Sequence, residues 1–348
     1  SILELSWRNL LMRIMITGGL GFIGSALVRK ILDTSESTIL NIDNCTYASM
    51  PEALEGRENS KHYIFKEIDI SDFKLVNNEI KEFKPNKIFH LAAESHVDRS
   101  ISDPTAFINT NIIGTFNLLQ SIKQLGSDLP KDFTFLHIST DEVFGSLGFE
   151  DEPFNEASPY KPNSPYSASK ASSDMLVRAW HKTYGLKTVI TNCSNNYGPW
   201  QNPEKLIPKI IFNALDGNTI PIYGNGENIR DWLHVDDHVN ALLKSSNYDE
   251  SFSRFNIGAN QEISNIELTK LICNYLDKKV PKNNPYFEQV QFVDDRLGHD
   301  LRYAINSEYI SSTLNFKPSY NLKQGIGETI EWYLKNTQWV RSKINQTK

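Results

Sequence analysis

Near its start the chain reads Arg13-Ile14-Met15-Ile16-Thr17-Gly18-Gly19-Leu20-Gly21-Phe22-Ile23-Gly24. The first five residues are typical of a short buried strand, and the apolar positions that follow the glycines, as far as Leu32, have helical spacing. Residues 38–42 predict a second strand, which Asp43 closes. This order of strand, glycine-rich turn, helix and strand predicts a βαβ unit, and therefore an α/β fold with a parallel sheet.

The glycine-rich turn and the acid after the second strand together predict a dinucleotide site. The glycines allow a tight turn, a close approach of the backbone to a pyrophosphate, and close packing of helix on strand. The amino terminus of the helix then faces the phosphates. Asp43 can accept a hydrogen bond from a ribose 2′-hydroxyl and would repel a 2′-phosphate, which favours NAD over NADP. An ordinary glycine turn with an incidental acid fits this ordered context poorly.

The alternation of strand and helix patterns continues as far as residue 192. Further strands are predicted over residues 63–66, 87–91, 133–138 and 187–192, and helices over 71–83 with Ser71 as the cap, 104–125 and 165–184. Such alternation predicts a Rossmann-like, doubly wound parallel sheet.

The pattern becomes irregular after Asn195-Asn196-Tyr197-Gly198-Pro199. The expected elements there are helices over 206–215, 236–246 (capped by Asp236), 265–276 and a closing helix over 322–334, with a strand over 220–223. We therefore expect residues 12–193 to form an NAD-binding domain, rejoined by about 229–258, and residues 194–348 to form a smaller α/β region that binds substrate. Residues 1–11 lack the features of a signal peptide and are interpreted as an extension.

A second segment supplies the candidate chemistry: Ser139-Thr140-Asp141-Glu142-Val143-Phe144-Gly145 follows an apolar strand. Open α/β sheets bind ligands outside the carboxyl ends of their strands. Tyr166 and Lys170 lie one turn apart on one face of the predicted helix 165–184. We expect Thr140, Asp141, Glu142, Tyr166 and Lys170 to form one set of proton-transfer groups.

The tyrosine and the two acids suggest different steps. A lysine ammonium and a cationic nicotinamide would both lower the pKa of Tyr166, which could then act as a base near neutral pH. Hydride transfer needs only one acid–base group, so Asp141 and Glu142 suggest extra proton transfers, such as removal of a C–H proton and loss of a hydroxyl. The alternatives are an ordinary i,i+4 pair on an exposed helix and two solvated acids at a strand end.

These motifs also carry a family resemblance. Tyr-x-x-x-Lys, placed after a Thr at a strand end and after the T-G-G-L-G-F-I-G turn, resembles the short-chain dehydrogenase/reductase superfamily, in its extended branch that acts on nucleotide sugars. The Ser139–Gly145 segment resembles that of the dTDP-glucose 4,6-dehydratase family, in which Asp and Glu are adjacent. Related decarboxylases and GDP-mannose dehydratases usually show Ser-Glu there, so Asp141 is the discriminating residue.

The resemblance extends from Met12 to about Leu334 and implies a set of binding residues. For the cofactor, NAD, it implies Gly18, Gly21, Phe22, Ile23, Gly24, Asp43, Asn44, Thr46, Asp69, Ile70, Leu91, Ala92, Ala93, Thr110, Tyr166, Lys170 and Asn196. For the nucleotide-sugar substrate it implies Ser95, Thr140, Asn195, Lys205, Leu206, Pro221, Tyr223, Arg230, Asn265, Arg296, His299 and Tyr303. The chain departs from the family pattern at Leu297, where proline is usual, and around Met50.

The implied reaction is the dehydration of dTDP-glucose to a 4-keto-6-deoxy sugar. Tyr166 takes the C4 hydroxyl proton while hydride passes to NAD, Glu142 removes the C5 proton, and Asp141 protonates the departing C6 hydroxyl. NADH then returns the hydride to C6. Thymine as the base rests on the resemblance alone.

Three alternative functions remain. A UDP-sugar 4-epimerase would not need the two acids, and a UDP-glucuronate decarboxylase would need a cationic pocket for the C6 carboxylate. An NAD-sensing scaffold would be expected to have a broken Tyr/Lys pair or glycine turn, and both are intact here.

The composition of the chain excludes some classes of binding partner and favours one cellular compartment. A net charge of −6 over 348 residues, with no basic run, argues against nucleic acid. No apolar run is long enough to span a membrane, and three cysteines without a C-x-x-C motif favour the cytoplasm. The histidines are interpreted as packed or hydrogen-bonded residues, so we expect no metal. The family implies a homodimer formed through helices 104–125 and 165–184.

Overall fold

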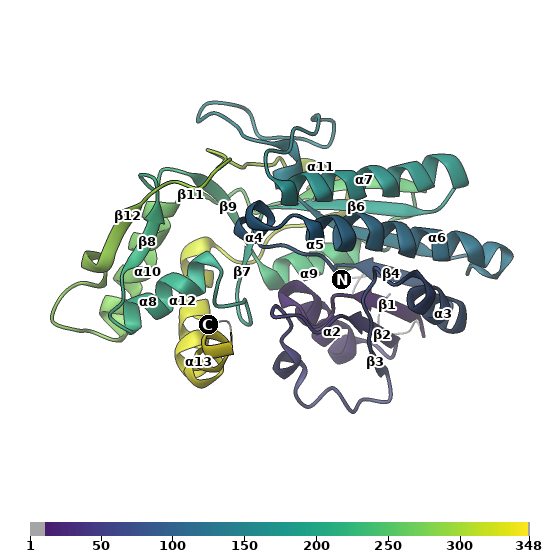
Figure 1. The fold of residues 1–348 in the computed structure, drawn as a ribbon, viewed down its shortest axis with the longest axis horizontal. Coiled ribbons are helices and arrows are strands. Elements are labelled where there is room, and N and C mark those ends of the chain that lie inside the picture. The colour runs from purple at the N-terminus through teal and green to yellow at the C-terminus, as the bar shows by residue number, and fades with distance from the viewer. Residues whose placement is uncertain (1–10, 347–348) are drawn as a thin grey trace.

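A computed structural model describes residues 11–346. At its centre lies a seven-stranded sheet with the order β10-β6-β5-β4-β1-β2-β3, in which every pair of neighbours is parallel (Figure 1). Its strands are β1 (Arg13–Thr17), β2 (Thr38–Asp43), β3 (Tyr63–Glu67), β4 (Lys87–His90), β5 (Thr134–Thr140), β6 (Thr188–Cys193) and β10 (Phe252–Ile257). The strand order runs outward from β1 in both directions, so the predicted doubly wound sheet is confirmed, with its switch point between β1 and β4.

Helices cover both faces of this sheet. On one face α2 (Phe22–Thr34) packs on α9 (Val235–Ser245), with α11 (Glu308–Leu314) in the same apolar cluster. On the other face lie α3 (Phe73–Phe83), α6 (Thr115–Leu125) and α7 (Pro165–Tyr184). Because helices cover both faces, every strand of this sheet except the edge strand β3 is mostly buried.

The helix predicted over residues 104–125 is helical from Thr105 to Leu125, but its hydrogen-bond register changes within it. It consists of α5 (Thr105–Phe107), a π-helical segment η2 (Ile108–Gly114) and α6, and a short helix α4 (Val97–Ser102) precedes it. The prediction of Ser71 as the cap of α3 is also wrong. Asp72 is the cap, and its carboxylate accepts a hydrogen bond from the Leu75 N–H at 3.0 Å, whereas the Ser71 N–H donates to Asp69. Such a cap contributes about 1 kcal/mol.

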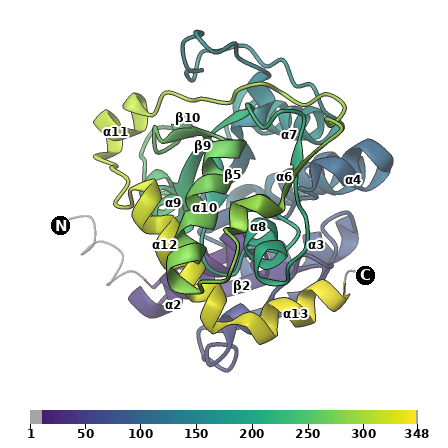
Figure 2. The same cartoon turned by 90° about the vertical axis from the view of Figure 1, so that its left-hand side faces the viewer.

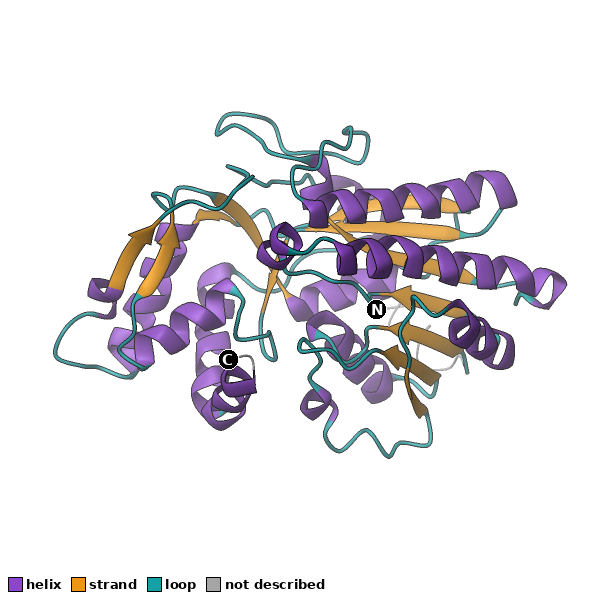
Figure 3. Ribbon diagram, viewed as in Figure 1, coloured by secondary structure: helices purple, strands orange, loops and turns teal. Residues whose placement is uncertain are grey.

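The rest of the chain builds a smaller α/β region (Figure 3). It contains a three-stranded sheet in the order β11 (Glu262–Ser264), β9 (Ile229–His234), β7 (Asn195–Tyr197), and a parallel pair, β12 (Val290–Val293) and β8 (Ile220–Tyr223). The helices α8 (Leu206–Leu215), α10 (Asn265–Lys279) and α12 (Leu322–Lys335) pack around one apolar cluster with them. Short 3₁₀ turns are η1 (Pro51–Leu54), η3 (Gly126–Asp128), η4 (Asp141–Phe144) and η5 (Tyr286–Gln289).

Two expectations for this region are corrected. The chain does not close on the helix 322–334, because α13 (Thr337–Gln346) follows it and buries Val340 beside the packed rings of Trp200, Trp332 and Trp339 (Figure 2). Asp236 is not the cap of α9: the side chain of His234 at the end of β9 accepts the Asp236 N–H.

The chain returns to the large sheet after starting the smaller region. β10 pairs with β6 from Phe252↔Thr188 to Ile257↔Cys193. The domain limits themselves, at 193 and at about 229–258, stay a prediction. The predicted extension 1–11 lies outside the described residues except for Leu11.

Candidate active site

A cavity of about 980 Å³ lies at the carboxyl ends of the parallel strands, between the large sheet and the smaller region. Its walls include every residue that the sequence predicted for catalysis, for the cofactor or for the substrate. The prediction missed further lining residues, among them Gln201, Glu204, Phe212 and Ile344.

The glycine turn forms one end of this cavity. Gly18 has φ +75°, and a β-carbon there would lie 2.6 Å from the Ala92 nitrogen. A β-carbon on Gly24 would lie 2.1 Å from the Gly18 oxygen, so the first turn of α2 can approach the strand only without a side chain. No side chain caps α2 after Gly21, which leaves its first N–H groups directed at the space where a diphosphate would bind.

Asp43 stands at the end of β2, at the rim of the same cavity. Its carboxylate accepts hydrogen bonds from the Leu20 N–H at 2.9 Å, the Cys45 N–H at 2.9 Å and the Ser49 hydroxyl at 2.8 Å. These bonds hold the acid in one position and leave lone pairs for a ribose hydroxyl. The structure therefore fits NAD in the manner that the glycine turn and Asp43 predicted.

Tyr166 and Lys170 reach the cavity from the first turns of α7. A capping box of Ser164 and Ser167, followed by Pro165, fixes where this helix starts. The Lys170 ammonium donates to the Ile138 carbonyl of β5 at 2.8 Å.

In this structure the pKa of Tyr166 is raised and not lowered as the sequence predicted. Burial, followed by the charges of Glu142, Cys193 and Asp141, raises the pKa of the Tyr166 phenol well above its usual value. Burial also lowers the pKa of Lys170 to about 8. The phenolate therefore needs more positive charge than the chain places beside it, and a cationic nicotinamide would add that charge.

The two acids occupy the 3₁₀ turn η4 directly after β5. The Thr140 hydroxyl accepts the Glu142 N–H at 3.3 Å and donates to the Asp141 carboxylate at 3.3 Å. Asp141 Oδ2 is buried without a hydrogen-bond partner among the described residues, so it is available to a ligand.

Different neighbours separate the pKa values of the two acids. Burial, then the charges of Glu142 and Asp231, raises the pKa of Asp141 well above its usual value. Burial also raises the pKa of Glu142, but three cations (Arg230, Arg296 and Lys205) oppose that rise. Asp141 is thus favoured as the protonated acid and Glu142 as the ionised base, the division of roles that the sequence predicted.

The wall opposite the cofactor turn is cationic. Lys205 donates to the Ser95 carbonyl at 3.1 Å, and Arg296 lies 3.6 Å from Asp98. The Arg230 guanidinium donates to the Ile229 carbonyl at 2.7 Å and the Asp300 carbonyl at 2.9 Å. These bonds use some of the guanidinium N–H groups that we expected to bind a diphosphate. The remaining N–H groups can bind a ligand.

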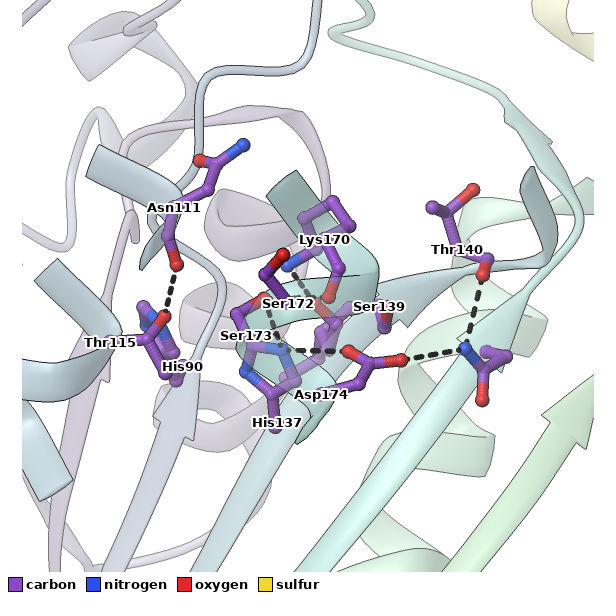
Figure 4. Close-up of polar contacts among 12 residues, drawn as sticks. His90, Asn111, Thr115, His137, Ser139, Thr140, Lys170, Ser172, Ser173 and Asp174 are labelled. Atoms are coloured by element: carbon purple, nitrogen blue, oxygen red, sulfur yellow. Dashed lines mark hydrogen bonds and ion pairs between the residues drawn. The ribbon is translucent and has the colours of Figure 1, made fainter. Parts of the chain in front are cut away.

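Several polar contacts were not predicted from the sequence. Glu204 binds Arg99 through both carboxylate oxygens, at 2.9 and 3.2 Å, and joins α4 to the loop before α8. The Asn111 amide of η2 donates to Ser169 of α7 at 2.8 Å (Figure 4 shows the surroundings). The sequence does not show which of these segments lie close together in space. These pairs could therefore not be predicted from it.

Residues 11–346 offer neither a metal-binding cluster nor a membrane-spanning helix. Within that range no group of three or more His, Cys, Asp or Glu side chains could hold a metal ion. None of the helices in the described part of the chain has the length and apolar character needed to cross a membrane.

Comparison with known proteins then identifies the family. A family model described as GDP-mannose 4,6 dehydratase matches residues 15–329. The chain belongs to this 4,6-dehydratase family. It is 50% identical over 341 residues to dTDP-glucose 4,6-dehydratase 1 of Escherichia coli K12, a match that covers 94% of each chain.

Solved structures give the same result. The dTDP-glucose 4,6-dehydratase DesIV of Streptomyces venezuelae, crystallised with NAD and TYD bound, is 39% identical, with a TM-score of 0.88 over 95% of this chain and 100% of that chain. The UDP-glucose 4-epimerase of Thermotoga maritima is 27% identical, with a TM-score of 0.83 over 94% and 100%. The resemblance and the fold class that the sequence indicated are confirmed.

Proposed function

We propose that this protein removes water from dTDP-glucose and forms dTDP-4-keto-6-deoxyglucose, with NAD as a cofactor that is regenerated in each cycle. The adjacent acids Asp141 and Glu142, in one cavity with Tyr166 and the glycine turn, are the observation that carries this proposal. The relatives named above support the substrate and the cofactor.

The chain's own groups hold NAD along one wall. The N–H groups at the start of α2 would bind its diphosphate, and Asp43 a ribose hydroxyl. When bound, NAD supplies the transient oxidation of the sugar at C4 and the final reduction at C6.

The first proton leaves the C4 hydroxyl of the glucosyl group. Tyr166 takes this proton as a base, and Thr140 hydrogen-bonds the phenol. The Lys170 ammonium, held by the Ile138 carbonyl, adds positive charge behind it. Once C4 is a ketone, the C5 proton is acidic enough for a carboxylate to remove.

The two carboxyl groups then complete the elimination. Glu142 accepts the C5 proton while Asp141 donates a proton to the C6 hydroxyl, which leaves as water. A proton returns to C5 when C6 is reduced. The raised pKa of Asp141 keeps that proton available near neutral pH. Lys205, Arg230 and Arg296 would bind the diphosphate of the substrate.

The test is incubation of the purified protein with dTDP-glucose, UDP-glucose and UDP-glucuronate, read by mass spectrometry without added reductant. Loss of one water from dTDP-glucose alone is the expected result. Loss of carbon dioxide from UDP-glucuronate would assign the protein to the decarboxylases. An unchanged mass with conversion of UDP-glucose to its 4-epimer, seen by chromatography, would assign it to the epimerases.

The homodimer and the cytoplasmic location are also proposals. Exposed apolar side chains on η2, α6 and α7, at Ile108, Ile113, Phe116 and Met175, support a dimer through these helices. Light scattering after gel filtration tests it, and cell fractionation tests the location.

A further inference from the structure

A buried carboxylate lies behind the catalytic helix face. Asp174 follows Lys170 by one turn and Tyr166 by two, so all three lie on one face of α7. Its exposed fraction is 0%. An acid is almost never fully buried unless it is paired, so its partners indicate its role.

Asp174 is held by three neighbouring elements. Its Oδ2 atom accepts the Tyr160 hydroxyl at 2.6 Å and the Asn192 amide at 3.2 Å, and its Oδ1 atom lies 3.1 Å from Nε2 of His137. Figure 4 shows Lys170, Ser173 and Asp174 of α7 facing His137 of β5. Despite burial, these partners and Lys170 lower the pKa of Asp174, so the carboxylate stays ionised.

The Asp174 carboxylate is linked to both groups of catalytic residues, the Tyr166–Lys170 pair and the turn that follows Thr140. Asn192 donates to the Thr140 carbonyl at 3.0 Å as well as to Asp174, and Thr140 begins the turn that carries Asp141 and Glu142. Lys170 donates to Ile138 of the same strand and attracts Asp174 electrostatically.

We propose that Asp174 is a positioning residue for both steps: its negative charge holds the Lys170 ammonium charged behind Tyr166, and Asn192 transmits its position to Thr140. This inference rests on the proposed function. Asp174 touches neither substrate nor cofactor, since it does not line the cavity.

The charges around Asp174 support this assignment. The titratable or charged groups that face it, or stand directly behind its partners, are His137 of β5, Tyr160 before α7, Lys170 of α7, Cys193 of β6 and Arg254 of β10. Burial lowers the pKa of His137 to about 4, so this ring is neutral. Arg254 lies 4.8 Å from the centre of the Tyr160 ring and donates to the Glu156 carbonyl.

Lys170 therefore depends on Asp174. Burial lowers the pKa of the Lys170 ammonium to about 8, and the charge of Asp174 is the largest effect that opposes this fall. Without that charge the ammonium would be lost closer to neutral pH, and Tyr166 would be deprotonated only at higher pH.

The main test is Asp174→Asn, which keeps the shape and removes the charge. Its amide oxygen can accept from Tyr160 and Asn192 as the carboxylate does. After mixing with dTDP-glucose, the reduction of bound NAD is followed in a single turnover as a function of pH. We expect the acidic limb to move up by about one pH unit or more, with about tenfold slower reduction at neutral pH and an unchanged KM.

Two matched variants separate charge from packing. Glu156→Gln removes a nearby, half-buried carboxylate that does not face Lys170, and Tyr160→Phe removes a hydrogen bond to Asp174 but keeps its charge. Both should keep the wild-type pH midpoint, although Tyr160→Phe can slow the reaction. Asp174→Ser, with room for a water, gives the same pH readout if the amide variant does not fold.

A second readout does not depend on turnover. Ultraviolet difference absorbance, with Tyr166→Phe as the blank, follows the ionisation of Tyr166 in the NAD-bound protein, where the cationic nicotinamide lowers the pKa of the phenol, and its midpoint should rise in Asp174→Asn. An unmoved midpoint in both readouts, or an equal shift in Glu156→Gln, would overturn the inference. If the unmodified protein fails to reduce NAD with dTDP-glucose, the proposed function fails, and the absorbance readout still tests Asp174.

Discussion

The two long walls of the cavity are built in different ways. The cofactor wall consists of turns at the ends of neighbouring parallel strands, and it offers mainly backbone N–H groups and one fixed acid, Asp43. The substrate wall consists of charged side chains from separate, irregular segments, such as Lys205 and Arg230, which loop carbonyls hold in place. A regular sheet can thus position a ligand without side chains, whereas an irregular region needs hydrogen bonds to fix each charge.

The largest effect should come from breaking the backbone of the cofactor wall. Gly24→Ala would place a β-carbon 2.1 Å from the Gly18 oxygen, so the helix and turn must move apart. We expect loss of measurable NAD binding by calorimetry and a lower melting temperature. In Gly21→Ala the nearest atom to the new β-carbon is the Gly18 oxygen at 3.3 Å, so that variant should lose NAD affinity but keep its melting temperature. Equal stability losses in both variants would contradict this account of the turn.

The next largest effect should come from changing Asp141, which lies between the cofactor wall and the substrate wall. Asp141→Asn cannot donate the proton that the C6 hydroxyl needs, so dehydration should slow by about 10²- to 10⁴-fold. Reduction of bound NAD by dTDP-glucose should change far less, because Tyr166 performs that step. Mass spectrometry measures the first and stopped-flow absorbance the second. Equal losses in the two rates would show that Asp141 does not act separately on the elimination.

The smallest effect should come from a contact between the walls. Lys343 of α13 donates to the Ser49 carbonyl at 3.1 Å and lies 3.4 Å from Glu52, beside the cofactor wall. Lys343→Ala should speed NAD dissociation by about two- to fivefold, the range of a partly exposed ion pair. Lys335→Ala, an exposed lysine at the end of α12, is the control and should leave the dissociation rate unchanged. A rate equal to wild type for Lys343→Ala would assign α13 no part in retaining the cofactor.

The contrast between regular and irregular regions also explains which elements could be predicted from the sequence. β1, α7, α8 and β8 have the predicted limits, because strand and helix periodicity and clear caps determine them. The π-helical segment at 108–114 was missed, since its apolar spacing reads like an ordinary helix, and its helical hydrogen-bond register is not encoded in that spacing. The helix α13 was missed because part of its packing comes from Trp200, which is far away in the sequence.

The site residues divide in a similar way. Gly18, Gly24 and Asp43 could be predicted from elementary stereochemistry, whereas Arg296 and His299 came only from the family resemblance. Asp174 was passed over because an acid in a helix pattern is usually exposed, and only the three-dimensional packing of β5, β6 and α7 shows that it is buried.

The position of β10 in the large sheet has a consequence for how the protein is made. The edge strand beside β6 comes from residues 252–257, and α13 reaches the cofactor wall only at residues 343–344. During synthesis the ribosome releases the glycine turn first and the segments that form β10 and α13 much later. A fragment that ends near residue 193 would expose the free edge of β6, where another chain could pair. The nascent chain therefore completes its cofactor site only after residues 252–257 and 343–344 have been released, and a truncation before residue 252 would leave β6 as an open edge.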